Sequence, residues 1–386
     1  MVENLIFKNF SYRKNANEKK KLLNYLKKIN NIQWPQFLSS YKKNYKYSYN
    51  KKLIKKYYLF KNINIIGMGG SSLGTKAIYN FLIHKIKKKI NFFENLNLKN
   101  NSQVTGLNII ISKSGNTLET ISNFNTCYNK SQKNIFITEK NNSYIRRLAS
   151  KLRSDIIEHK NFIGGRFSVL SEVGMLPAQL MGLNESKFKQ FNNLITKKKF
   201  LNNLTNNVLG MYDLIKKRKF NSIVLNYDPY SEDLFKWYQQ LVSESLGKNS
   251  RGVLPIISTM PKDNHSLLQL YLSGFKSNFY TFYIVEESNI PKLNSKLLFN
   301  NFNFLKQKNI FEIFNSQRIA TENIFKSKKI PFRTFYIKKR NEETLGELFC
   351  FFTLEVILLS HLLKVNPLNQ PEVELIKKET FKILKK

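Results

Sequence analysis

The sequence predicts an α/β protein built from two doubly wound parallel sheets. Along its 386 residues, short apolar runs typical of strands alternate with longer segments typical of amphipathic helices. The alternation is interrupted once, by a polar stretch rich in Lys and Asn near residues 185–207. Parallel strands need a crossover between them, so this alternation predicts sheets covered by helices on both faces. The single interruption predicts two such domains.

The individual elements follow from these patterns. In the first run we expect strands at 62–66, 107–112 and 134–138, and helices at 74–86, 117–128 and 143–152. In the second run we expect strands at 220–226, 253–257 and 279–285, and helices at 232–246 and 265–272. The chain then divides into an N-terminal helical extension (1–50), a first α/β domain (51–190), a second α/β domain (191–341) and a C-terminal helical segment (342–386) that packs across both domains.

Cysteine content and hydropathy indicate a cytoplasmic protein. Cys127 and Cys350 are far apart, which excludes a disulfide framework and suits a reducing compartment. Residues 1–12 have neither a continuous apolar segment nor a small-residue cleavage site, so we expect no signal peptide. The apolar stretch 348–363 is shorter than a membrane span and is interrupted by Glu355 and His361, so we expect a buried helix and no membrane association.

The formal net charge of +38 raises the question of nucleic-acid binding. The positive residues are almost all lysines, spread along the whole chain together with an excess of Asn, Ile, Phe and Tyr. Short runs occur at Lys19–Lys21, Lys87–Lys89, Lys197–Lys199 and Lys216–Lys219. This distribution favours a general compositional bias over one basic face, so we expect solvated lysines and no specific nucleic-acid partner.

A glycine-rich loop, Gly67–Gly74, follows a predicted strand and precedes a predicted helix. Glycines allow close approach to a ligand, and the helix N-terminus offers free N–H donors. Ser72 stands where a dinucleotide-binding fingerprint requires glycine, and Lys76 does not follow Gly74 directly as a P-loop requires. The loop therefore suits an anion or a polyol, and a simple tight turn between strand and helix is the alternative.

A second loop between strand and helix, Ser112–Thr120, concentrates hydroxyl groups. Ser112, Ser114 and Thr117 lie within six residues at a helix start, with Lys113 between the two serines. Helix capping explains one such hydroxyl, but not three together with a glycine. Hydroxyls and free backbone N–H groups can bind phosphate oxygens, so we expect this loop to hold a phosphomonoester.

Six segments in this order resemble the glucose-6-phosphate isomerase family, in a short bacterial-type form. They are Gly67–Gly74, Ser112–Thr120, Gly164–Ser171, Gln240–Lys248, Asp263–Ser266 and Asn366–Pro371, the last followed by Lys377. The resemblance implies two sugar-isomerase (SIS-type) domains and interconversion of glucose 6-phosphate and fructose 6-phosphate through a cis-enediolate, in glycolysis and gluconeogenesis and without a cofactor. Asn369 and Glu372 depart from the family pattern, which has aspartate and glycine there, and Lys378 is an alternative to Lys377.

The resemblance also implies roles for single residues. The catalytic residues would be Glu244 as the base, Arg166 at the enediolate, and His265 with Lys377 in ring opening. The substrate would be bound by Gly70, Ser71, Ser112, Lys113, Ser114, Thr117, Gln240 and Gln370. In the family this histidine comes from the partner subunit, so the resemblance implies a homodimer with a shared active site.

Local sequence supports some of these roles. Gln240 and Glu244 are four residues apart on a predicted helix and therefore share one face, and Gly247 is placed to end that helix. Asp263 is placed to cap a helix that begins at His265, where the helix N-terminus would favour a neutral imidazole. An ordinary surface glutamate and an arginine that ties loops together are the structural alternatives for Glu244 and Arg166.

Other functions are left open by single motifs. A non-catalytic sugar-phosphate-binding regulator would keep the hydroxyl loop but has no need of Glu244, Arg166, His265 and Lys377 together. A bifunctional phosphoglucose/phosphomannose isomerase would share all of these residues. No His, Asp or Glu cluster has metal-ligand spacing, so we expect no metal site.

Overall fold

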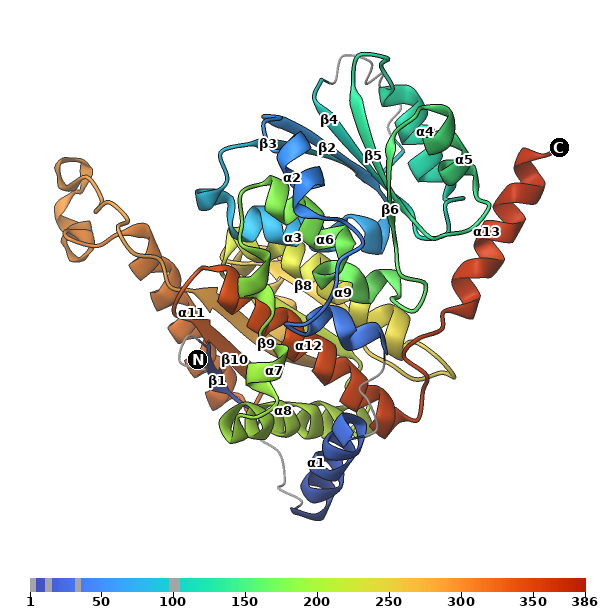
Figure 1. Cartoon of the computed structure of the whole chain (residues 1–386). Coiled ribbons are helices and arrows are strands. Elements are labelled where there is room, and N and C mark those ends of the chain that lie inside the picture. The colour runs from blue at the N-terminus through green and yellow to red at the C-terminus, as the bar shows by residue number, and fades with distance from the viewer. Residues whose placement is uncertain (1–4, 11–15, 32–35, 97–104) are drawn as a thin grey trace.

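The computed structural model describes residues 5–10, 16–31, 36–96 and 105–386 (Figure 1). The described chain forms two five-stranded sheets with helices around them. Half of residues 1–12, where we expected no signal peptide, and parts of the predicted extension 1–50 lie outside the described residues. The α/β class with two mainly parallel sheets is confirmed.

The first sheet has the order β3-β2-β4-β5-β6, and all of its neighbours are parallel. Its strands are β2 (Asn62–Gly67), β3 (Lys89–Phe93), β4 (Leu107–Ile111), β5 (Lys133–Thr138) and β6 (Asp155–Glu158). Its helices are α2 (Lys51–Tyr57), α3 (Leu73–Phe81), α4 (Leu118–Cys127), α5 (Tyr144–Lys151) and α6 (Glu172–Leu180). The three predicted strands are the central ones, and the two edge strands were not predicted.

Side chains that alternate along the central strands of this sheet enter different cores. Ile66 and Ile110 pack with Phe124 of α4 and Ile145 of α5 on one face. Their neighbours on the same strands enter the main core on the other face, which α3 and α6 cover. This double burial explains the nearly continuous apolar runs that identified these strands in the sequence.

The second sheet has the order β1-β10-β9-β7-β8. Its strands are β1 (Leu5–Lys8), β7 (Asn221–Asn226), β8 (Leu254–Thr259), β9 (Asn278–Val285) and β10 (Phe332–Ile337). Its helices are α8 (Lys198–Lys216), α9 (Glu232–Leu246), α10 (Leu268–Ser273) and α11 (Ile310–Ser327). Strand β1 runs antiparallel to β10. Therefore the N-terminal region, which we expected to be helical, contributes an edge strand to the second sheet besides helix α1 (Ala16–Asn31).

The polar stretch expected near residues 185–207 is more ordered than a bridge. It contains the short helix α7 (Phe191–Leu194) and the first half of α8. Phe200, Leu204 and Val208 recur at helical spacing and are fully buried, while Lys198 and Lys199 are exposed. The high polar content therefore concealed an amphipathic helix.

The two C-terminal helices differ in how deeply they are buried. Helix α12 (Glu342–Leu363) is the one described helix long and apolar enough to cross a membrane, but 89% of its most apolar window is buried inside the protein. It packs on α8 and α9 as a core helix. Helix α13 (Pro371–Leu384) has no buried residue and extends away from the body of the protein (Figure 1).

Candidate active site

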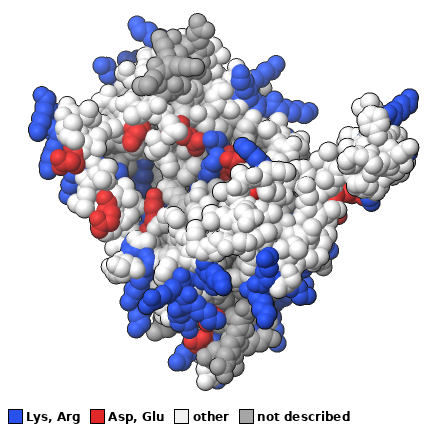
Figure 2. All heavy atoms as spheres, turned by 180° about the vertical axis from the view of Figure 1, so that it is seen from behind, with Lys and Arg blue, Asp and Glu red and all other residues white. Residues whose placement is uncertain are grey.

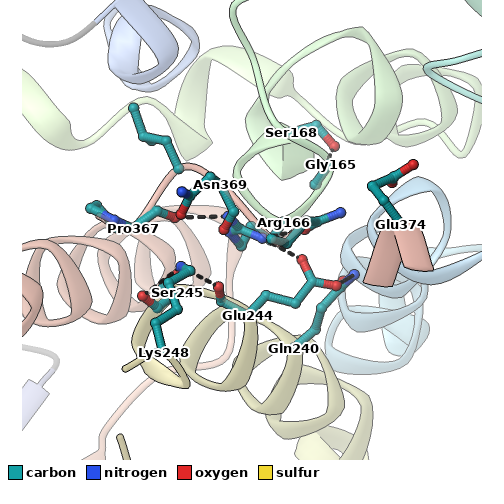
Figure 3. A network of polar contacts seen from close by, with 12 residues as sticks. Gly165, Arg166, Ser168, Gln240, Glu244, Ser245, Lys248, Pro367, Asn369 and Glu374 are labelled. Carbon is teal, nitrogen blue, oxygen red and sulfur yellow. Dashed lines mark hydrogen bonds and ion pairs between the residues drawn. The ribbon is translucent and has the colours of Figure 1, made fainter. Parts of the chain in front are cut away.

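The end of helix α9 presents the central carboxylate of the site. Glu244 Oε2 lies 2.5 Å from Arg166 Nη1, and Glu244 Oε1 accepts a hydrogen bond of 2.9 Å from Gln240 Nε2 (Figure 3). Gln240 and Glu244 share a face because they are one helical turn apart, as predicted. Gly247 caps the helix, also as predicted. Since α9 packs against α3 and the 3₁₀ helix Gly165–Leu170, this carboxylate faces the first domain.

Arg166 connects this helix to the C-terminal segment. Its side chain is only 3% exposed, and Nη2 donates to the carbonyl oxygens of Pro367 at 2.8 Å and Asn369 at 3.2 Å. Nη1 also donates to Gln370 Oε1. Burial lowers the pKa of Arg166, while the Glu244 carboxylate opposes this shift. The buried guanidinium of Arg166 therefore binds both Glu244 and the segment 367–370, which are distant from it in sequence.

The glycine loop packs directly against the arginine segment. A Cβ atom on Gly70 would lie 2.3 Å from the carbonyl carbon of Gly165, so no side chain fits there. Ser168 Oγ donates to the Gly70 carbonyl at 3.2 Å. Gly69 has φ +56°, and a Cβ there would lie 2.9 Å from Gln240 Nε2. The glycines let the loop reach both Arg166 and α9, with Ser71 partly exposed beside them.

Two polar groups within this cluster are buried without a hydrogen-bond partner among the described residues. They are Arg166 Nε, a donor, and Gln240 Oε1, an acceptor. Buried polar groups are normally satisfied, because leaving one unpaired costs about 1–3 kcal/mol. A donor and an acceptor on two side chains that both bind Glu244 suit hydroxyl groups, which can donate and accept. The cluster is therefore suited to a polyhydroxylated ligand.

The hydroxyl loop is held by its own short-range contacts. Ser112 Oγ lies 2.9 Å from Thr117 Oγ1 and accepts a hydrogen bond of 3.1 Å from the Gly115 backbone N–H. Gly115 has φ +69°, and a Cβ there would lie 2.1 Å from Ser143 Oγ. Ser114 is exposed, and Thr117 is the N-cap of α4 but makes no capping bond with its side chain. The free capping position leaves donors at the start of α4 for an anion.

The lysine of this loop is engaged with protein groups. Lys113 Nζ donates to the Asn161 carbonyl at 2.7 Å and lies 3.5 Å from Glu139 Oε1. It ties the loop after β4 to the loop after β6. Lys113 therefore bonds to Asn161 and pairs with Glu139 in this arrangement, and its positive charge remains close to the loop.

The surroundings of His265 differ from the prediction. The expectation that a helix begins at His265 with Asp263 as its N-cap is wrong, because α10 begins at Leu268. The Asp263 carboxylate accepts bonds of 2.8 Å from Ser258 Oγ and the Thr259 N–H, which fixes a separate 3₁₀ turn. His265 ends this turn and is exposed.

The structure places Lys377 outside the Arg166–Glu244 network. Lys377 Nζ pairs with Glu374 at 2.7 Å on α13, and its side chain is 51% exposed. The cavity beside Glu244 has a volume of about 640 Å³ and is enclosed by the end of α9, residues 247–251 and residues 366–373. Lys377 is not among its lining residues. The network as folded thus unites Glu244, Arg166, Gln240 and Gln370, whereas His265 and Lys377 lie on exposed surfaces.

Three features of the site had not been predicted from the sequence. Pro367 and Asn369 act through backbone carbonyls, which leave no signal in residue type. Lys248 lies within the segment Gln240–Lys248, and its position just after a helix C-terminus was the signal that could have identified it. Across the described part of the chain, no three His, Cys, Asp or Glu side chains form a group that could hold a metal ion.

The chain is similar in sequence to known proteins. The sequence model of the family described as phosphoglucose isomerase matches residues 54–261. The glucose-6-phosphate isomerase of Methanocaldococcus jannaschii is 33% identical over 84% of this chain and 85% of its own length. That of Mycoplasmopsis synoviae is 31% identical over 83% and 82%.

Solved structures show the same fold. A glucose-6-phosphate isomerase from Chlamydia trachomatis matches with a TM-score of 0.77 at 17% identity, covering 100% of this chain and 89% of that one. A hypothetical protein from Thermus thermophilus matches with a TM-score of 0.82 at 20% identity, covering 96% and 95%. From the family match and the sequence identities, the chain belongs to the phosphoglucose isomerase family.

Proposed function

We propose that this chain interconverts D-glucose 6-phosphate and D-fructose 6-phosphate through a cis-enediolate, as a step of glycolysis and gluconeogenesis. The observation that carries the proposal is the Glu244 carboxylate, held 2.5 Å from the buried Arg166 guanidinium in a member of this family. An aldose–ketose isomerase needs a base that moves a proton between C2 and C1 and a positive charge at the oxygens that become an enediolate. Glu244 and Arg166 supply these two functions.

The contacts of Glu244 indicate how its carboxylate is held. Both carboxylate oxygens carry a hydrogen bond, one from Arg166 and one from Gln240. Each oxygen accepts only one of these bonds and keeps a second lone pair, so Glu244 can still accept a proton from the substrate carbon. Arg166 Nε and Gln240 Oε1 have no partner among the described residues and can serve a sugar hydroxyl. The bonds from Arg166 and Gln240 thus orient the carboxylate while it acts as the base.

The proposed isomerisation moves one proton between the two carbons and one between their oxygens. Glu244 takes the proton from C2 of the open-chain aldose, and the electron pair forms the C1–C2 double bond of the enediolate. Arg166 stabilises the negative oxygen as this charge develops. Glu244 returns the proton to C1 while the proton of the O2 hydroxyl passes to the neighbouring O1, so that the C2 carbonyl and the C1 hydroxyl of the ketose form. Ser112 and Thr117 hold the phosphate throughout, so C1 and C2 keep their position relative to the Glu244 carboxylate.

Ring opening by His265 and Lys377 is part of this proposal, with a homodimer that shares its active sites. Both residues lie on exposed surfaces, where a second subunit can meet them. The segment between β9 and α11 projects as an arm (Figure 1) and carries Leu297, Phe299 and Phe304 with 76%, 83% and 69% exposure. Apolar side chains this exposed favour burial against a partner. Sedimentation analysis tests the dimer, and a monomer at assay concentration would contradict it.

The positive charge does not favour a nucleic-acid function. Figure 2 shows Lys and Arg on several parts of one face, most densely toward its lower end, with Asp and Glu among them and a broad uncharged area across the middle. Nucleic-acid binding requires a basic stripe or patch. We therefore propose a cytoplasmic enzyme with a sugar-phosphate substrate and without a nucleic-acid or membrane partner.

A coupled assay that follows fructose 6-phosphate conversion to glucose 6-phosphate tests the activity. Turnover is expected for this pair, and a purified, folded chain without turnover would overturn the proposal. Mannose 6-phosphate as a second substrate tests the bifunctional alternative. Substrate binding without turnover would instead favour a sugar-phosphate-binding regulator.

A further inference from the structure

We infer that Lys248 is a positioning residue of the isomerase site, which fastens the helix carrying Glu244 to the segment carrying Gln370. Its Nζ donates to three backbone carbonyls, at 2.7 Å to Glu244, 2.9 Å to Ser245 and 2.7 Å to Asn366. The first two belong to the last turn of α9, and the third precedes the residues that hold Arg166. This inference rests on the proposed isomerase function.

The chemistry of these contacts assigns a positioning role and not a catalytic one. An ammonium group has three N–H donors and no acceptor, and all three donors of Lys248 are used by backbone oxygens. None is left for the substrate. The carbonyls at a helix C-terminus lack intrahelical partners and carry partial negative charge, so a cation there stabilises the helix end.

The backbone around Lys248 is shaped to hold this position. Asn249 and Ser250 have φ of 53° and 56°, which is uncommon for residues other than glycine. They close a tight turn in which Lys248 and Arg251 pair across an isolated antiparallel bridge. A serine in the left-handed region costs conformational energy, and such costs concentrate at functional sites. The turn fixes the Lys248 side chain over the gap between α9 and residue 366.

The consequence for catalysis follows from the neighbouring contacts. Pro367, Asn369 and Gln370 supply the acceptors that orient Arg166, and they directly follow Asn366. Without the Lys248 contact, Asn366 loses its tie to the helix that carries the base. The position of Arg166 relative to Glu244 would then no longer be fixed. The phosphate loop is built by other residues and would remain intact. The effect should therefore appear in kcat and not in KM.

The ionisation of Lys248 offers a second readout. Burial, with a smaller contribution from the nearby Arg166, lowers the pKa of Lys248 to about 8, and Glu244 acts in the opposite direction. Arg251 and Glu372 line the same cavity and complete the charged groups nearby. Below this pKa the ammonium serves all three carbonyls. Above it the neutral amine has two N–H groups, so one carbonyl loses its donor and kcat should decline.

The test compares Lys248→Met, which has similar length but no donor, with Lys248→Arg, which retains several donors and a permanent charge. We expect Lys248→Met to lower kcat about 10- to 100-fold with KM within about twofold, since small misplacements of reacting groups cost this much. Lys248→Arg should recover part of kcat and lose the decline above pH 8. The matched control is Lys236→Met, which removes a lysine of helix α9 whose ion pairs with Glu232 and Asp233 lie at the opposite end of that helix, and it should keep kcat within about twofold.

Amide hydrogen exchange of Leu368, whose N–H donates to Asn366 Oδ1 at 2.9 Å, separates this inference from the proposed function. Faster exchange in Lys248→Met than in wild type is expected whether or not the wild type turns over sugar phosphate. An inactive wild type would overturn the function alone. Unchanged exchange, an unchanged kcat in an active enzyme, or a loss confined to KM would overturn the role of Lys248. If Lys248→Met does not fold, Lys248→Gln takes its place with the same expected order of kcat and the same overturning results.

Discussion

The phosphate loop and the Arg166–Glu244 network are built in different ways. The loop closes on itself within one domain through the Ser112–Thr117 contact, five residues apart. The network joins Arg166 to Glu244 and Gln370, which are 78 and 204 residues away along the chain. Phosphate binding therefore depends on local sequence, whereas the chemistry depends on how both domains and the C-terminal segment pack. Substitutions can therefore separate the two functions.

The largest expected effect comes from Glu244→Gln, which leaves the phosphate loop untouched. Removing the base should lower kcat about 10²- to 10⁴-fold, the usual range for a general base, with little change in KM. Steady-state kinetics with fructose 6-phosphate measure this. The matched control is Glu232→Gln, the same substitution in the first turn of α9, where Glu232 forms an exposed pair with Lys236. Near-wild-type turnover of Glu244→Gln would refute the assigned base.

Gly70→Ala tests whether the network depends on packing between loops. The new Cβ would lie 2.3 Å from the Gly165 carbonyl carbon, so the glycine loop and the arginine segment must separate. We expect kcat to fall about 10-fold or more and the free energy of unfolding to fall about 1–3 kcal/mol.

Gly164→Ala is the control for Gly70→Ala, because its Cβ would meet only Phe167 at 3.5 Å. Denaturant titrations and kinetics should show this variant close to wild type. Equal effects of the two substitutions would contradict the tight contact between Gly70 and Gly165.

The double substitution of Ser112→Ala and Thr117→Ala tests whether the hydroxyl loop binds the phosphate of the substrate. Each lost hydrogen bond to a charged group costs about 1.5–3 kcal/mol, so affinity for the sugar phosphate should fall about 10-fold or more. The loss should appear in substrate affinity, measured by calorimetry, and also in the inactive Glu244→Gln background. Ser131→Ala, an exposed turn serine of the same domain, is the control. Unchanged affinity would remove the phosphate assignment.

The smallest effect is expected from Asn369→Asp. The contact of residue 369 with Arg166 uses the backbone carbonyl, so the side chain is free to change. kcat and KM should stay within about twofold of wild type, since a surface substitution away from such contacts usually changes little. A tenfold change in either constant would show that the side chain takes part.

The sequence predicted most of what depends on periodicity and local motifs. The central strands of the first sheet, helix α9 with its cap at Gly247, and the closeness of Gln240 to Glu244 all follow from spacing along one element. The edge strand β1 was missed, because a four-residue strand has too few alternations to reveal a pattern. Strand β10 was missed because polar residues interrupt its apolar run. The turn at Asp263 was read as a helix cap, since the same carboxylate can serve either structure.

Contacts between distant segments could not be predicted in the same way. The meeting of Arg166 with the carbonyls of Pro367 and Asn369 depends on how α12 crosses the core, which no local pattern encodes. The position of Lys377 on an exposed helix likewise follows from tertiary arrangement. The roles of Arg166 and Lys377 follow from the family resemblance, and their contacts follow from the structure.

The use of backbone carbonyls around Arg166 has a consequence for how this enzyme can diverge. Carbonyl oxygens at residues 367 and 369 are present whatever side chains stand there, so mutation can drift through these positions while the guanidinium keeps its acceptors. The asparagine at 369, where relatives are expected to have aspartate, is such a change. Gln370 has no such freedom, because its contact is made by the side chain. In a lineage with strong compositional bias, many side chains of this segment can therefore be substituted while Arg166 keeps its backbone contacts.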